Sequence, residues 1–120
     1  MKDLPEKYAE LVRLRPEMAV TQEFRPGKEC TLTRSDRFPN WEWRCHSGVW
    51  STERDDCAAS LIESKLVREL PNGCQIRKAN STHWAIATPE TALDLDLRYH
   101  PDPLSALFAF HLSNVAGGEK

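Results

Sequence analysis

The chain has 120 residues, of which 40% are hydrophobic and 28% are charged, and its formal net charge is −2 with an isoelectric point near 6.1. This length suits one core, so we expect a single domain over residues 1–120, and no apolar run approaches the roughly 20 residues that a membrane-spanning helix needs. The near-neutral charge gives no general attraction to phosphate backbones, which argues against non-specific binding of nucleic acid.

The first residues and the cysteines bear on the cellular compartment. The opening "MKDLPEKYAEL" has acidic residues and a proline where a secretory signal needs a basic start and an apolar run, so we expect a cytoplasmic protein. The cysteines lie 12 to 17 positions apart, at Cys30, Cys45, Cys57 and Cys74. Structural zinc sites draw on much closer cysteine pairs. We therefore expect four reduced cysteines, mostly buried, and no bound metal or cofactor.

A short amphipathic helix is predicted at the start of the chain. Apolar residues recur there at intervals of three and four, at Leu4, Tyr8, Leu11 and Val12. The helix should end near Arg15, because the residue before a proline, here Pro16, avoids helical geometry. Residues 18–40 contain β-branched pieces interrupted by Pro26-Gly27, and we expect them to be irregular with at most one short strand.

The stretch from Asn40 to Thr52, "NWEWRCHSGVWST", predicts a hairpin. Side chains alternate between the two faces of a strand, so Trp41, Trp43 and Cys45 share one face. The opposite face then carries Glu42, Arg44 and His46.

A two-residue turn at Ser47-Gly48 would place Trp43 opposite Thr52 and Cys45 opposite Trp50, so that all three tryptophans share a face. A large aromatic face is normally covered in a soluble protein. We therefore expect Trp43 and Trp50 to be core residues beneath the next helix. The polar face with Glu42, Arg44 and His46 should meet water or a partner.

The next helix should begin near Thr52, which has the spacing of an N-terminal capping box with Asp55. Its apolar stripe consists of Ala58, Leu61, Ile62, Leu66 and Leu70, and "PNG" at 71–73 ends it. The segments "CQIRKA" and "HWAIAT", separated by "NST", predict a second hairpin. The alternation over residues 93–99 favours a further strand, with a helical extension across residues 91–97 left open.

A last helix is predicted to begin with Asp102 as its cap and Pro103 as its first residue. Its apolar stripe consists of Leu104, Leu107, Phe108, His111, Leu112 and Val115, and Gly117-Gly118 ends it. Phe110 lies away from this stripe, which suggests contact with another chain. The predicted fold class is α+β, a small antiparallel sheet of hairpins packed with two or three helices in a layered sandwich.

The segments "VWSTERDDCAASLIESKL", "GCQIRKANSTHWAIAT" and "DPLSALFAFHLSNV" together resemble the small phage and prophage proteins of the ABA-sandwich type. In that family a Trp-containing hairpin leads into an Ala-rich helix, then a second hairpin with a central Trp, then a C-terminal helix. The resemblance covers the C-terminal two thirds, and the predicted strand at 93–99 departs from it. It implies a fold and a mobile-element setting more than an activity. For such a setting we expect an accessory protein that acts by protein–protein binding, as an inhibitor or modulator of a host system.

Two chemical alternatives remain open. Asp94, Asp96 and His100 would share a strand face and could hold the divalent ion of a nuclease, although Arg98 between them would repel a cation. Exposed tryptophans beside Arg34, Arg37 and Arg44 would suit single-stranded nucleic acid.

The leading hypothesis is a non-catalytic protein that binds a protein partner or a second copy of itself. The sequence does not predict that Cys45 or Cys57 is a catalytic nucleophile. Cys45 and His46 point to opposite strand faces, and acidic residues beside Cys57 oppose its thiolate. The binding residues expected from the sequence are Arg34, Arg37, Glu42, Arg44, His46 and Phe110.

Overall fold

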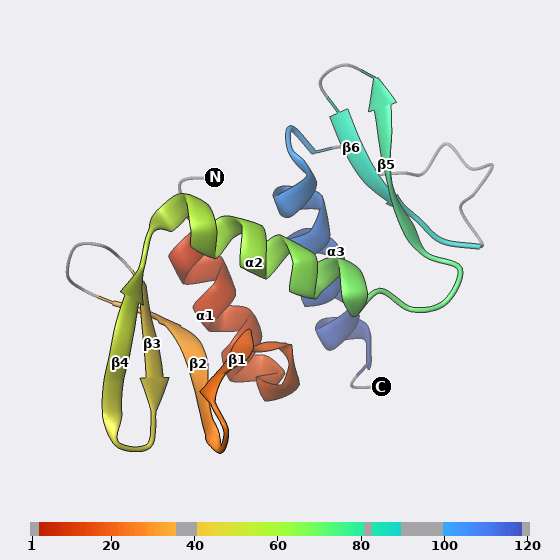
Figure 1. Ribbon diagram of the computed structural model, residues 1–120. Coiled ribbons are helices and arrows are strands. Elements are labelled where there is room, and N and C mark those ends of the chain that lie inside the picture. Colours follow the sequence, from red (N-terminus) through yellow and green to blue (C-terminus); the bar gives the residue numbers. More distant parts are fainter. Residues whose placement is uncertain (1–2, 36–40, 81–82, 90–99, 119–120) are drawn as a thin grey trace. The chain divides into compact units, whose positions relative to one another are not determined.

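The computed structural model describes residues 3–35, 41–80, 83–89 and 100–118, and its fold class is α+β, as predicted (Figure 1). In chain order the elements are α1 (Leu4–Leu14), the short 3-10 helix η1 (Pro16–Met18), β1 (Thr21–Arg25), β2 (Lys28–Arg34), β3 (Trp41–Cys45), β4 (Gly48–Glu53), α2 (Asp55–Arg68), β5 (Gln75–Asn80), β6 (His83–Ala87) and α3 (Pro103–Gly118).

The chain divides into two compact units, Asp3–Ile62 and Glu63–Lys120 together with the first two residues. The division falls within α2, so this helix contributes to both. The expectation of a single domain stays a prediction, and each unit is described by itself.

The first unit is built on an antiparallel sheet with the strand order β1-β2-β3-β4 (Figure 1). The expectation that residues 18–40 are irregular was wrong, because β1 and β2 form a hairpin. Pro26-Gly27 makes the turn between them: Arg25 pairs with Lys28, and Gly27 has a φ of 79°. Proline followed by a residue of positive φ is typical of a type II turn, so this dipeptide connects two strands.

Helix α1 packs on the sheet through Tyr8, as its predicted apolar stripe requires. The Tyr8 hydroxyl donates a hydrogen bond to the backbone carbonyl of Leu32 at 2.7 Å and accepts one from the backbone N–H of Val20 at 3.0 Å. The Tyr8 ring also meets Trp41 edge-on, with ring centroids 5.6 Å apart. One buried side chain therefore holds the helix, a strand and the segment leading into β1.

The β3–β4 hairpin is confirmed, but its register differs from the prediction. Cys45 pairs with Gly48, so the two turn residues are His46 and Ser47, and Trp43 pairs with Ser51. Trp41 and Trp43 are buried, as expected, whereas Trp50 is 37% exposed, so the prediction that Trp50 is a core residue was wrong. The register changes between Trp43, which pairs with Ser51, and Arg44, which pairs with Val49. Trp50 is therefore left as an extra, unpaired residue of β4, a β-bulge.

The start of α2 also differs from the prediction. Thr52 belongs to β4 and pairs with Glu42, and the helix begins at Asp55. Asp55 accepts a hydrogen bond from the Trp41 indole N–H at 2.8 Å. Ala58 and Ile62 are buried, which confirms the apolar stripe in the half of the helix that belongs to this unit.

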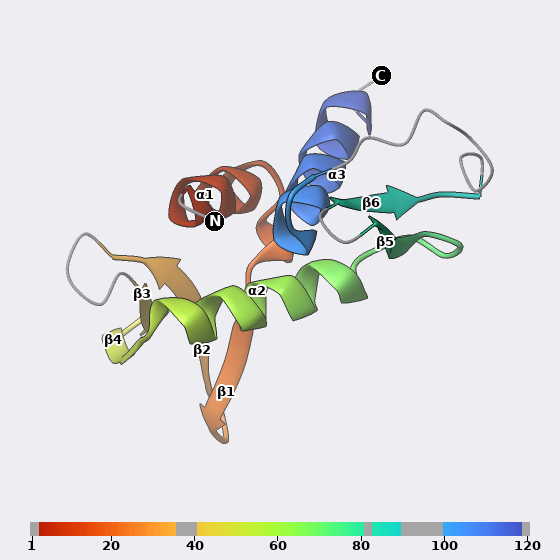
Figure 2. The same cartoon turned by 90° about the horizontal axis from the view of Figure 1, so that it is seen from above.

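In the second unit, β5 and β6 form the second predicted hairpin, and α3 packs against both strands (Figure 2). The predicted cap of α3 is present: the Asp102 carboxylate accepts a hydrogen bond from the backbone N–H of Ser105 at 2.7 Å. His111 is buried and hydrogen-bonded through Nε2 to the carbonyl of Leu66 at 2.9 Å, which identifies it as a core histidine.

The predicted strand at 93–99 lies outside the described residues, and His100 forms a backbone bridge with Trp84. Within the described part of the chain, no helix has both the length and the hydrophobicity to span a membrane.

Candidate functional site

The most exposed aromatic cluster of the described residues gathers on one side of the four-stranded sheet. We call it the Trp50 cluster, and it consists of Phe24, Arg25, Lys28, Trp43 and Trp50. The Phe24 ring meets Trp43 edge-on at 5.3 Å between centroids and lies 6.3 Å from Trp50. Trp43 is the buried floor of the cluster, and Trp50 is its exposed surface.

Two β-bulges in the sheet determine where the Phe24 and Trp50 rings lie. The register of β1 with β2 shifts between Glu23 and Arg25, and this leaves Phe24 as an extra residue. The register of β3 with β4 shifts in the same way and leaves Trp50 as an extra residue. Such bulges redirect a side chain and are frequent next to functional sites. Here two of them, on the first and the last strand of the sheet, bring their aromatic residues together.

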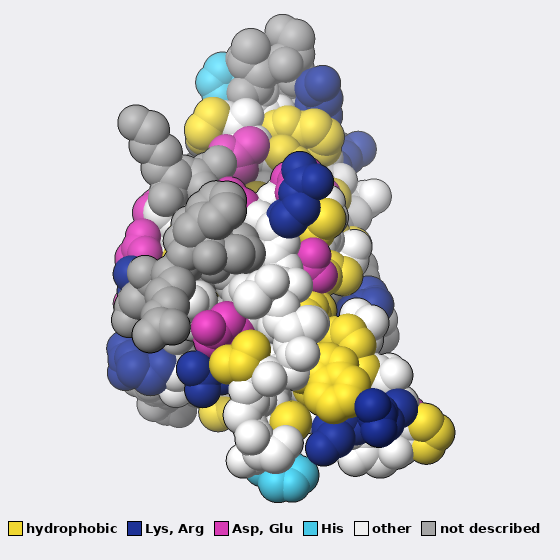
Figure 3. Space-filling view, turned by 60° about the vertical axis from the view of Figure 1, so that its left-hand side comes forward, with side chains coloured by type: hydrophobic (Ala, Val, Ile, Leu, Met, Phe, Trp, Pro, Cys, Tyr) yellow, Lys and Arg dark blue, Asp and Glu magenta, His cyan; other side chains and the backbone are white. Residues whose placement is uncertain are grey.

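Two cations border the exposed indole. The Arg25 guanidinium carbon lies 4.8 Å from the centroid of the Trp50 ring, and the Lys28 ammonium nitrogen lies 5.7 Å from it. Both distances are within the range in which a cation is attracted to the face of an aromatic ring. Figure 3 shows exposed hydrophobic side chains bordered by Lys and Arg in the lower part of that view.

These two cations differ from Arg34 and Arg44, the arginines predicted to bind a partner, because those two form ion pairs. Arg34 forms an ion pair with Glu6 at 3.5 Å, and Arg44 forms one with Glu42 at 2.9 Å. Among the described residues, no carboxylate forms an ion pair with Arg25 or Lys28. The positive charge of the Trp50 cluster is therefore available to a ligand.

The structure brings together only part of the predicted binding set. Glu42 and Arg44 lie side by side on the sheet face opposite Trp43, as expected, and His46 is exposed in the turn that follows. Phe110 lies on α3, half-buried, with its ring edge-on to His111 at 5.4 Å between centroids. Arg37 lies outside the described residues. Arg34 forms its ion pair with Glu6 of α1. The six predicted binding residues therefore do not form one site.

The residues of the Trp50 cluster on β1 and β2 were missed because residues 18–40 were expected to be irregular. The signal that could have found them is "EFRPGK": a Pro-Gly turn between two strands places Arg25 opposite Lys28, with Phe24 one position earlier.

The metal alternative gains no support from the described residues. His100 is described, but Asp94 and Asp96 are not, and within the described ranges no three His, Cys, Asp or Glu side chains are grouped so that they could hold an ion.

The cysteines differ from the expectation that most are buried. All four are free thiols, yet only Cys30 is buried, and Cys57 is exposed. Desolvation and the carboxylates of Asp56 and Glu53 raise the pKa of the Cys57 thiol, which disfavours its thiolate, as its acidic neighbours predicted.

Comparison of the chain with protein-family models, with curated proteins and with solved structures finds no match.

Proposed function

We propose that this chain is a non-catalytic binding protein and that its Trp50 cluster binds an acidic segment of a partner protein. The observation that carries the proposal is an exposed indole beneath a guanidinium at 4.8 Å, with no carboxylate of the described residues on either bordering cation. Tryptophan and arginine are the residues most enriched among those that dominate the free energy of protein association.

The chemistry of the cluster defines the partner. An apolar side chain of the partner would cover the exposed part of the Trp50 ring, and an adjacent Asp or Glu would reach Arg25 and Lys28. A cation that is already held over a ring loses less side-chain entropy when it binds a carboxylate than a freely rotating cation does, which favours affinity. Phe24, which is half-buried, contacts both the buried Trp43 ring and the Trp50 ring and so helps to hold Trp50 in place.

A nucleic-acid strand is a poorer fit for the same surface. Binders of single strands neutralise several phosphates along a groove. Here the ring is bordered by only two cations, Arg25 and Lys28, too few to neutralise a run of phosphates. A short acidic peptide needs only the two cations and the ring.

The resemblance to phage ABA-sandwich proteins supports a setting for this activity. In that setting the partner is a host or phage protein in the cytoplasm, and the chain inhibits or modulates it. Binding by a compact aromatic and basic surface would suit such a role, because it needs no cofactor and no catalytic residue in this chain.

A peptide-display selection tests the proposal. A random library is selected on the wild-type protein, and the enriched peptides are then measured against Trp50→Ala and against the matched control Val49→Ala. Val49 is a suitable control because it is the neighbour of Trp50 in β4, is more exposed, at 48%, and carries no aromatic ring. We expect enriched peptides that combine Asp or Glu with an apolar residue, bind more weakly at high salt, and lose affinity with Trp50→Ala but not with Val49→Ala.

Three results would overturn the proposal. The first is enrichment of peptides without acidic residues, and the second is unchanged affinity for Trp50→Ala. The third is binding of a thymidine oligonucleotide that quenches tryptophan fluorescence in wild type and is lost in Trp50→Ala, since this would assign the surface to nucleic acid.

A further inference from the structure

Two of the cysteines face each other across neighbouring strands. Thr31 on β2 pairs with Arg44 on β3, so one step further along this antiparallel register places Cys30 directly opposite Cys45. Opposed residues of antiparallel strands have Cα atoms about 4.5–5.5 Å apart, within the range of about 4.4–6.8 Å that a disulfide spans. The backbone therefore needs little movement to allow a bond between the two sulfurs.

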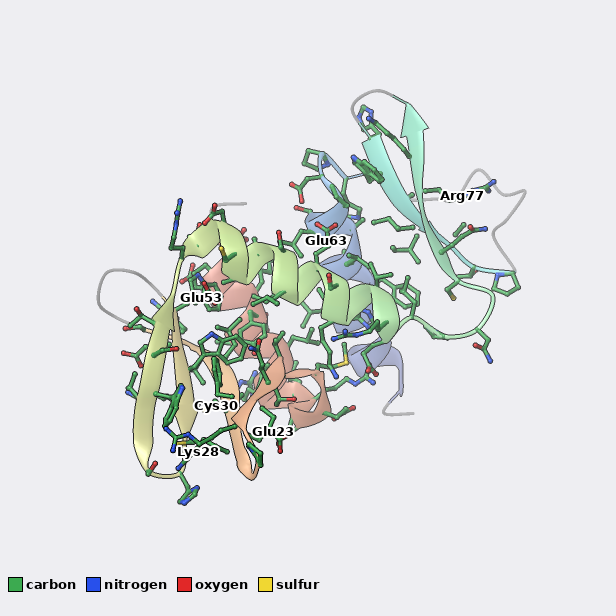
Figure 4. All side chains as sticks on the ribbon, in the orientation of Figure 1. Glu23, Lys28, Cys30, Glu53, Glu63 and Arg77 are labelled. Atoms are coloured by element: carbon green, nitrogen blue, oxygen red, sulfur yellow. The ribbon has the colours of Figure 1, made fainter. Side chains whose placement is uncertain are left out.

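The surroundings give the two thiols different roles. The Cys45 Sγ lies 3.0 Å from the Ser47 hydroxyl, and Cys45 is partly exposed, whereas Cys30 has no exposed surface. Hydrogen bonds from the Ser47 hydroxyl and backbone lower the pKa of the Cys45 thiol, with Lys28 contributing a smaller attraction. Burial raises the pKa of Cys30, and the nearby Cys45 raises it further. Figure 4 shows Lys28 and Cys30 close together along β2.

We propose that Cys30 and Cys45 are a redox pair that hydrogen peroxide oxidises to a cross-strand disulfide. The accessible Cys45 thiolate attacks one oxygen of the peroxide. A sulfur–oxygen bond forms, the oxygen–oxygen bond breaks, and hydroxide leaves and takes up a proton to become water. The product is a Cys45 sulfenic acid.

The second step involves the buried partner. The Cys30 sulfur attacks the Cys45 sulfur, the sulfur–oxygen bond breaks, and the leaving hydroxide combines with the Cys30 proton to form a second water. In total two thiols lose two electrons to one peroxide, and a dithiol reductant restores them. Cys45 is thus the attacking thiol and Cys30 the resolving thiol. This inference does not depend on the proposed binding function.

The test uses the full-length wild-type protein, reduced and then freed of reductant. It is treated with an equimolar amount of hydrogen peroxide, and peptides are mapped by mass spectrometry without reduction. We expect a loss of two hydrogens, a linked pair of peptides containing Cys30 and Cys45, and full reversal by dithiothreitol. Cys57, which is exposed but surrounded by acidic residues, serves as the internal control and should stay reduced.

Variants at the exposed turn separate the chemistry from folding. Ser47→Ala removes the hydroxyl beside the Cys45 sulfur and should slow disulfide formation several-fold, whereas Ser47→Thr keeps a hydroxyl and should react at close to the wild-type rate. Oxidation of Cys57 before Cys45, accumulation of Cys45 sulfinic acid without a link to Cys30, or equal rates for Ser47→Ala and Ser47→Thr would each overturn the proposal.

Discussion

Removal of a single oxygen atom from Tyr8 should cost a large share of the stability of the first unit. Tyr8→Phe keeps the ring and its edge-on contact with Trp41, and deletes only the hydroxyl. Without it the carbonyl of Leu32 and the N–H of Val20 each lose a partner in a buried position. An unsatisfied buried group costs about 1–3 kcal/mol, so for the two groups we expect a loss of about 2–6 kcal/mol of the roughly 5–15 kcal/mol that typically stabilises a domain.

Urea denaturation measures this loss as a lower midpoint with an unchanged slope. Thr33→Val is the matched control, since the Thr33 hydroxyl makes one longer hydrogen bond, at 3.3 Å, to the carbonyl of Glu42 on a less buried face. We expect the control to cost less than about 1 kcal/mol. A Tyr8→Phe loss no larger than that of the control would refute the role given to the hydroxyl.

The same hydroxyl predicts how stability depends on pH. Burial raises the pKa of Tyr8 to about 12 from its ordinary value of 10.0, while the hydrogen bond from Val20 opposes this shift. In the unfolded chain the phenol ionises near its ordinary pKa, so its contribution to stability is complete below pH 10 and is lost as the pH rises toward 12. Two pKa units correspond to about 2.7 kcal/mol. The stability difference between wild type and Tyr8→Phe should therefore shrink over this range, and a constant difference would contradict the burial of the phenol.

Two further predictions concern a turn and the tryptophans. A Cβ at Gly73, where φ is 88°, would lie 2.7 Å from the Pro89 ring, whereas a Cβ at Gly27, with a φ of 79°, would meet nothing within 4 Å. Gly73→Ala should therefore be less stable than Gly27→Ala by about 1–3 kcal/mol in urea denaturation. Equal losses of stability in the two variants would show that the Pro89 ring moves aside to accommodate the new methyl group. Trp43→Ala should cost about 3–5 kcal/mol because the indole is buried, whereas Trp50→Ala should cost about 1 kcal/mol or less, measured in the same way. A larger loss for Trp50→Ala would mean that Trp50 belongs to the core.

Much of the fold was predictable from local patterns. The helices α1 and α3 follow from apolar residues at helical spacing and from the Asp102 cap, and the β5–β6 hairpin follows from alternation around a short polar turn. These signals depend on residues close in sequence. They can therefore be recognised without knowledge of how distant parts of the chain pair or pack.

The candidate site was less predictable because it depends on register. Alternation alone puts Trp43 and Trp50 on one face of a hairpin, but it does not show that an extra residue on β4 leaves Trp50 at the surface. Nor does it show that a second bulge turns Phe24 toward it. The ion pair of Arg44 with Glu42 could have been anticipated, since residues two apart on a strand share a face.

The most direct test of the central claim is a backbone and indole NMR titration of the full-length protein with an acidic peptide from the display selection. We expect the largest shift changes at the Trp50 indole and at the amides of Arg25 and Lys28. The indole N–H groups of Trp41 and Trp43, which are bonded to Asp55 and Glu53, should change little. Changes centred instead on the Glu42–Arg44 face of the sheet, or on α3 around Phe110, would contradict the assignment of binding to the Trp50 cluster.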